Sequence, residues 1–131
     1  MTSWATGIGA NTLFVADLEA AKAFYANAFA AEPMFEDDDS AVFQLGNTLV
    51  NLLRAQAVPE LIEPAAAAEA AAGARLVFTV EVDDVDARAE WLTATGVTLL
   101  NGPMDRPWGP RTASFQDLDG YVWEIAGQSR P

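Results

Sequence analysis

Two amino acids are missing from this chain, because none of its 131 residues is a cysteine or a histidine. The first absence excludes disulfides, thiolate metal sites and cysteine nucleophiles. The second excludes every mechanism that needs an imidazole as a base or as a metal ligand. These two absences narrow the chemistry of the protein more firmly than any other feature of its composition.

Basic residues are scarce as well, with 7 Lys and Arg against 19 Asp and Glu, which gives a formal net charge of −12. A chain with this charge is repelled by nucleic-acid phosphates and by anionic membranes, so we expect neither as a partner. The excess of acid either attracts a cationic ligand or serves solubility alone.

Long apolar runs are also absent. No stretch of about 18 apolar residues occurs, so the sequence predicts no transmembrane helix. The first ten residues, MTSWATGIGA, lack the basic region and apolar core of a signal peptide. We therefore expect the protein in the cytoplasm.

The residues that are present form two similar halves. VADLEAAKAFYANAF, from Val15, matches VDDVDARAEWLTATG, from Val82, and each segment has an aspartate, Asp17 or Asp84, at the expected N-cap of a helix. Further along, AVFQLGNTLVNLL matches ASFQDLDGYVWEI. This second match makes Asn51 the equivalent of Glu124.

Each half is predicted to run strand, helix and three strands. The predicted elements of the first half are 9–16, 17–30, 33–37, 40–45 and 48–54. Those of the second half are 76–82, 84–95, 97–101, 111–116 and 121–126.

These elements predict a single α+β domain over residues 1–131, built from two tandem βαβββ modules. The first module covers 1–58 and the second 75–131. The Ala-rich segment 59–74 between them is either a short helix or a plain linker. One module buries too little surface to be stable alone. Two modules side by side are therefore expected to form a cupped mixed sheet, whose open face is a cleft suited to a ligand.

The chain resembles the glyoxalase/bleomycin-resistance/dioxygenase superfamily, also called the vicinal oxygen chelate superfamily. The matching segments are LFVADLEAAKAFYANAF, FTVEVDDVDARAEWL and WGPRTASFQDLDGYVWEI. The last segment is the most specific, because it joins a WGxR motif to a DxDG turn and a Trp-Glu pair. The resemblance implies the paired βαβββ fold and a homodimer.

Enzymes of this superfamily hold a divalent metal at four positions, which the resemblance places on Ala10, Asn51, Val77 and Glu124. Of these, Glu124 is a good ligand, and Asn51 offers one neutral carbonyl. Ala10 and Val77 offer nothing. Because a catalytic transition-metal site needs about three protein ligands, we expect no metal and no other cofactor. The resemblance is thus closest to the metal-free, bleomycin-resistance-like binding proteins.

Strand alternation indicates which residues face the cup. If Trp123 faces the helices, Glu124 faces the cup, where it binds a ligand or a metal, or pairs with Arg111 in a purely structural role. Arg111 itself either reaches a carboxylate or a ligand, or lies exposed at the edge. Trp108, in the rigid loop RPWGPR, either stacks on a ligand or packs at the dimer interface.

The remaining candidates come from the same alternation and from the repeat. Phe43 and Phe115 are equivalent in the two halves and are expected to face the cup as a pair. The full predicted ligand-binding set is Glu124, Asn51, Trp108, Arg111, Phe14, Phe43, Phe115, Leu53 and Thr79.

The preferred function from sequence is metal-independent binding of a small aromatic molecule, such as a cationic antibiotic. The alternative is a divalent-metal-dependent lyase, isomerase or dioxygenase with an atypical site at Glu124. A regulatory domain that has lost its ligand is a third possibility.

Overall fold

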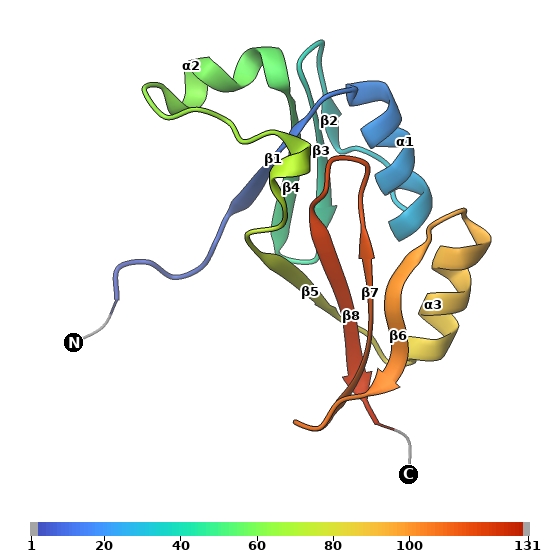
Figure 1. Cartoon of the computed structure of the whole chain (residues 1–131). Coiled ribbons are helices and arrows are strands. Elements are labelled where there is room, and N and C mark those ends of the chain that lie inside the picture. Colours follow the sequence, from blue (N-terminus) through green and yellow to red (C-terminus); the bar gives the residue numbers. More distant parts are fainter. Residues whose placement is uncertain (1–2, 130–131) are drawn as a thin grey trace. The chain divides into compact units, whose positions relative to one another are not determined.

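The computed structural model describes residues 3–129, which contain two four-stranded mixed sheets with a helix packed against each (Figure 1). The chain divides into two units, residues 1–68 and 69–131, and each unit holds one of the sheets. No helix among residues 3–129 is long and apolar enough to cross a membrane.

The first unit begins with a strand, a helix and three strands. They are β1 (Ala10–Val15), α1 (Leu18–Phe29), β2 (Phe35–Glu36), β3 (Ser40–Leu45) and β4 (Thr48–Arg54). The strand order is β1-β4-β3-β2, with β1 parallel to β4 and the other pairs antiparallel. Alternate residues of β1 and β4, such as Leu13 and Leu52, are buried, and α1 packs on β3 and β4.

The second unit repeats this order. Its elements are β5 (Val77–Glu81), α3 (Val85–Ala94), β6 (Leu99–Asp105), β7 (Pro110–Gln116) and β8 (Val122–Gln128). The strand order is β5-β8-β7-β6, again with one parallel pair, β5 with β8. The fold class predicted from the sequence, α+β with two βαβββ modules, is therefore confirmed.

Both long helices start as the sequence predicts. The Asp17 side chain accepts a hydrogen bond from the backbone N–H of Ala20, and the Asp84 side chain accepts one from Ala87. Each carboxylate thus satisfies one of the backbone donors that a helix leaves free at its first turn.

The segment between the two sheets contains short helical turns. They are the 3-10 turns Ala55–Ala57 and Ala70–Ala72 and the helix α2 (Val58–Ile62). Of the two alternatives for the Ala-rich segment, the short helix is thus present, at its beginning. Val58 is fully buried and anchors the start of α2.

One strand is longer than predicted. The predicted strand 97–101 is found as β6, Leu99–Asp105, which pairs with β7 through two irregularities between Leu99 and Met104. Gly102 and Pro103 suggest a strand end in sequence, because proline gives no ladder hydrogen bond. Here they lie at the irregularity, which lets pairing resume beyond them.

The turn between β7 and β8 is held by a buried carboxylate. One oxygen of Asp117 accepts hydrogen bonds from the backbone N–H groups of Asp119 and Tyr121, both at 2.9 Å. Gly120 adopts a φ of +90°, which favours glycine. The DxDG motif therefore fixes the register in which β8 enters the sheet.

Candidate functional site

The two faces of the second sheet differ sharply. Side chains of Trp123 and Ile125 on β8 and of Ala113 and Phe115 on β7 are buried on one face. Helix α3 covers this face. Its Asp86 binds Arg111, and the Arg111 side chain lies on the same face as that of Ala113 because the two residues are two positions apart on β7. The other face carries Glu124, so we call it the Glu124 face.

Cross-strand rows define the Glu124 face. In one row Thr79 of β5, Glu124 of β8 and Ser114 of β7 lie side by side. The Thr79 hydroxyl donates a hydrogen bond to Glu124 Oε1 at 3.0 Å. In that row Glu124 is thus oriented by a neutral hydroxyl, and its carboxylate forms no ion pair within residues 3–129.

An arginine that the sequence analysis did not select lies over the same face. Arg106 donates from Nε to the hydroxyl of Thr112 at 2.8 Å and from Nη2 to Asn101 Oδ1 at 2.7 Å. Thr112 belongs to the row next to that of Glu124. The Glu124 face therefore carries a carboxylate and a guanidinium, each held by neutral partners.

The first sheet has an equivalent row. Asn51 of β4 lies between Thr12 of β1 and Val42 of β3, on the face opposite the buried Val50 and Leu52. Its Oδ1 is buried and has no hydrogen-bond partner among the described residues. Because Thr12–Asn51 and Thr79–Glu124 hold the same place in the two sheets, the repeat inferred from sequence is present in the strand register.

The expected orientation of Phe43 and Phe115 is wrong. Phe43 is 2 % exposed and lies 6.3 Å from the ring of Tyr25 on α1. Phe115 is fully buried and stacks on Trp123 at 6.5 Å. The repeat correctly makes the two residues equivalent, but both face the helix-covered side of their sheets and belong to the core.

Arg111 does not pair with Glu124, because the two side chains lie on opposite faces of the sheet. Its guanidinium binds both carboxylate oxygens of Asp86 at 2.8 and 2.9 Å and one oxygen of Asp105 at 3.2 Å. These bonds, led by those to Asp86, raise the pKa of Arg111 further above its already high ordinary value. Arg111 is thus a clamp between β7, β6 and the first turn of α3.

This clamp leads to a prediction for stability. Arg111→Met keeps the aliphatic stem but leaves Asp86 and Asp105 without their cation, so we expect the melting temperature to fall by roughly 4 °C. Arg88→Met, which removes an exposed charge from α3 that makes no ion pair among the described residues, is the matched control. Thermal unfolding followed by circular dichroism measures both, and equal melting temperatures would contradict the clamp.

Of the other predicted residues, Phe14 and Leu53 lie where strand alternation puts them, and Trp108 lies in the predicted loop. Phe14 and Leu53 are paired in register and half-buried, on the same face as Asn51. Trp108 is 70 % exposed, in the turn between β6 and β7, and Arg106 lies over its ring at 5.6 Å. Their part in ligand binding stays a prediction.

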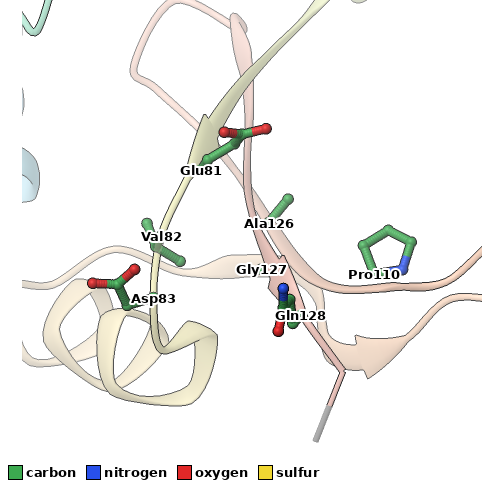
Figure 2. Close-up of a pocket in the computed structure, with 7 residues that line it drawn as sticks. All are labelled: Glu81, Val82, Asp83, Pro110, Ala126, Gly127 and Gln128. Carbon is green, nitrogen blue, oxygen red and sulfur yellow. The ribbon is translucent and has the colours of Figure 1, made fainter.

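A cavity of about 520 Å³ continues the Glu124 face toward the end of β8. It is lined by Glu81, Val82, Asp83, Pro110, Ala126, Gly127 and Gln128 (Figure 2). Glu81 and Ala126 form the row next to Thr79 and Glu124. Figure 2 shows the Glu81 carboxylate on the side of β8 and the Asp83 carboxylate turned away from it. The cavity thus adds one acid, Glu81, to the same face.

Comparison with known protein families shows the family to which the chain belongs. A family model described as the Glyoxalase/Bleomycin resistance protein/Dioxygenase superfamily matches residues 7–125. The chain belongs to this superfamily. A search of curated proteins gave no match.

Solved structures of the superfamily are similar over nearly the whole chain. A glyoxalase/bleomycin resistance protein/dioxygenase from Nocardioides is 27% identical, with a TM-score of 0.85, and the match covers 97% of this chain and 86% of that one. A glyoxalase-related enzyme from Fulvimarina pelagi is 25% identical, with a TM-score of 0.81, and the match covers 95% of this chain and 89% of that one. A lactoylglutathione lyase from Agrobacterium tumefaciens, at 21% identity and a TM-score of 0.76 with 95% and 96% covered, shares the fold.

The residues at the superfamily's metal positions do not suit a transition metal here. Ala10 and Val77 are exposed and apolar, and on the parallel neighbour strands the residues in register with Asn51 and Glu124 are threonines. Among residues 3–129 no group of three or more His, Cys, Asp or Glu is placed to hold a metal ion. The first unit offers the amide oxygen of Asn51 and the second the carboxylate of Glu124, so neither unit by itself supplies the three ligands typical of such sites.

Four residues of the Glu124 face were not predicted from the sequence: Arg106, Asn101, Thr112 and Glu81. Glu81 could have been predicted, because it follows Thr79 by two residues on a predicted strand. Arg106 could not have been predicted, since its position depends on the extension of β6 beyond residue 101 and on hydrogen bonds across the sheet.

Proposed function

We propose that this protein binds a small aromatic molecule without a metal, and that a cationic or N–H donor group of the ligand meets Glu124. The observation that carries the proposal is the state of that carboxylate. It accepts one hydrogen bond, from the neutral Thr79 hydroxyl, and forms no ion pair within the described residues. An ionised carboxylate has about four acceptor sites, so most of its capacity is left for a ligand.

Three further observations support the proposal. The residues at the superfamily's metal positions include two apolar side chains, Ala10 and Val77. The Trp108 indole is 70 % exposed in the loop next to the Glu124 face, where an aromatic ring can stack on it. The formal charge of −12 favours a cationic ligand over an anionic one at long range.

The test is a thermal-shift screen with aromatic amines, because a compound that binds the folded state raises the melting temperature by mass action. Glu124→Gln should weaken binding of the compounds found by about tenfold or more, since a charged hydrogen bond becomes a neutral one. Glu90→Gln, on the exposed side of α3, makes the same change of net charge and should leave the affinity unchanged.

Two outcomes would contradict the proposal. Equal affinities of the two variants would remove Glu124 from the site. Stoichiometric Fe, Mn, Ni or Zn in the purified protein, measured by mass spectrometry, would favour a metal-dependent lyase, isomerase or dioxygenase instead.

A further inference from the structure

Arg106 differs from the other arginine of the second sheet in the charge of its partners. Arg111 binds two carboxylates, whereas Arg106 binds the hydroxyl of Thr112 and the amide oxygen of Asn101. Arg106 forms no ion pair with any carboxylate among residues 3–129. Its guanidinium is therefore left without a directly bonded carboxylate, in a chain whose formal net charge is −12.

The guanidinium is nevertheless fixed in place. Two hydrogen bonds at 2.7 and 2.8 Å hold it, and the Trp108 ring lies 5.6 Å from its central carbon. A guanidinium has five N–H donors, so three are left after the bonds to Thr112 and Asn101. Planar and oriented in advance, this group matches the geometry of a carboxylate or a phosphate.

Closing the loop does not require this guanidinium. The backbone N–H of Arg106 donates to the Pro110 carbonyl at 2.8 Å, and Gly109 donates to the Arg106 carbonyl at 3.0 Å. The Ser129 hydroxyl also donates to the Gly109 carbonyl at 2.6 Å. The main chain thus closes the turn, while the side chain of Arg106 turns back over the sheet.

The position of Arg106 relative to Glu124 suggests a ligand with two charges. Arg106 is held by β7 and β6, whereas Glu124 is on β8, which is the other neighbour of β7. Thr112 is one strand and one same-face row away from Glu124, and with strands roughly 5 Å apart and such rows roughly 7 Å apart this offset is on the order of 8 Å. The pair shares one face and does not form a salt bridge.

We propose that Arg106 binds an oxyanion of the ligand, so that the ligand of the Glu124 face carries a carboxylate or phosphate at one end and a cation at the other. This inference rests on the proposed function, because Glu124 is taken to hold the cationic end. It assigns Arg106 a role in specificity, with Thr112 and Asn101 as the residues that position it.

The test uses three probes that share a ring and differ in charge: benzoate, benzylamine and 4-(aminomethyl)benzoate. Titration of the ¹⁵N-labelled protein at constant ionic strength, followed by NMR, gives a dissociation constant for each probe, including weak ones. The wild type should bind 4-(aminomethyl)benzoate most tightly. Arg106→Gln should weaken benzoate and 4-(aminomethyl)benzoate by about tenfold or more and leave benzylamine within about twofold.

The matched control is Arg88→Gln, which removes the same charge from the exposed surface of α3. It should leave all three affinities unchanged. Phenyl phosphate in place of benzoate shows whether Arg106 prefers a phosphate to a carboxylate.

Three results would overturn the role of Arg106. One is an equal loss of all three probes in Arg106→Gln, which would indicate a structural role. Another is an equal loss of benzoate in Arg88→Gln, which would indicate general charge attraction. The third is the absence of any saturable response of wild-type protein to benzoate. Failure of the proposed function is seen separately, because benzylamine would then bind Glu124→Gln as tightly as wild type.

Discussion

Replacing Phe115 by alanine is expected to lower the free energy of unfolding by about 3–5 kcal/mol. The ring is fully buried and stacks on Trp123 with an interplanar angle of 10°. Truncation removes apolar area and leaves a cavity under α3 that the surrounding rings fill only in part. Denaturant unfolding with an unchanged slope would measure this loss directly.

Leu118→Ala is the control for this experiment. Leu118 is 60 % exposed in the turn that follows β7, so its truncation should change stability by less than about 0.5 kcal/mol. If Phe115→Ala were as mild as Leu118→Ala but weakened a bound ligand, Phe115 would line the site as the repeat first suggested. A large loss of stability places it in the core.

Replacing Gly102 by alanine is expected to cost about 2–5 kcal/mol, by two separate effects. Gly102 has a φ of +83°, a conformation in which an L side chain is strained by about 1–2 kcal/mol. An added Cβ would also lie 2.4 Å from the Thr112 carbonyl oxygen and 2.8 Å from Ala113 Cα. Both are backbone atoms of β7, so β6 must move away from its partner strand.

Gly96→Ala separates the two effects. Gly96 has a similar φ of +97°, but nothing lies within 4 Å of its added Cβ. It should show the backbone strain alone, about 1–2 kcal/mol. The difference between the two variants then measures how closely β6 approaches β7 at Gly102. Equal losses would contradict that close approach.

The elements of this protein were largely predictable, because each rests on a local signal. Asp17 and Asp84 cap the helices as the sequence indicates. The repeat also placed Asn51 and Glu124 at equivalent positions, and the strand registers agree. Signals of this kind need no knowledge of what lies across the sheet.

The faces of the side chains were harder to predict, because alternation fixes only relative positions within one strand. Glu124 was placed correctly relative to Trp123 on its own strand. Phe115 and Arg111 lie on β7, whose register to β8 is set by the Asp117 turn. An error of one residue in that register moves every side chain of the strand to the opposite face.

Arg106 shows the limit of local signals. The loop RPWGPR contains two arginines of similar local context, yet one clamps α3 and the other lies over the Glu124 face. What separates them is the pairing of β6 with β7 beyond Gly102. Such pairing depends on contacts between segments and leaves no pattern within the loop itself.

Because Thr112 and Asn101 hold Arg106 in place, the pH dependence of ligand retention is restricted. Neither partner takes up or loses protons, so nothing that holds the guanidinium changes between acidic and alkaline surroundings. At this end of the site, the pKa of the ligand's own acid group then decides the pH at which the ligand dissociates. A carboxylate ligand would dissociate on acidification, because its own acid group becomes neutral. A stronger acid, such as a phosphate monoester, would stay bound.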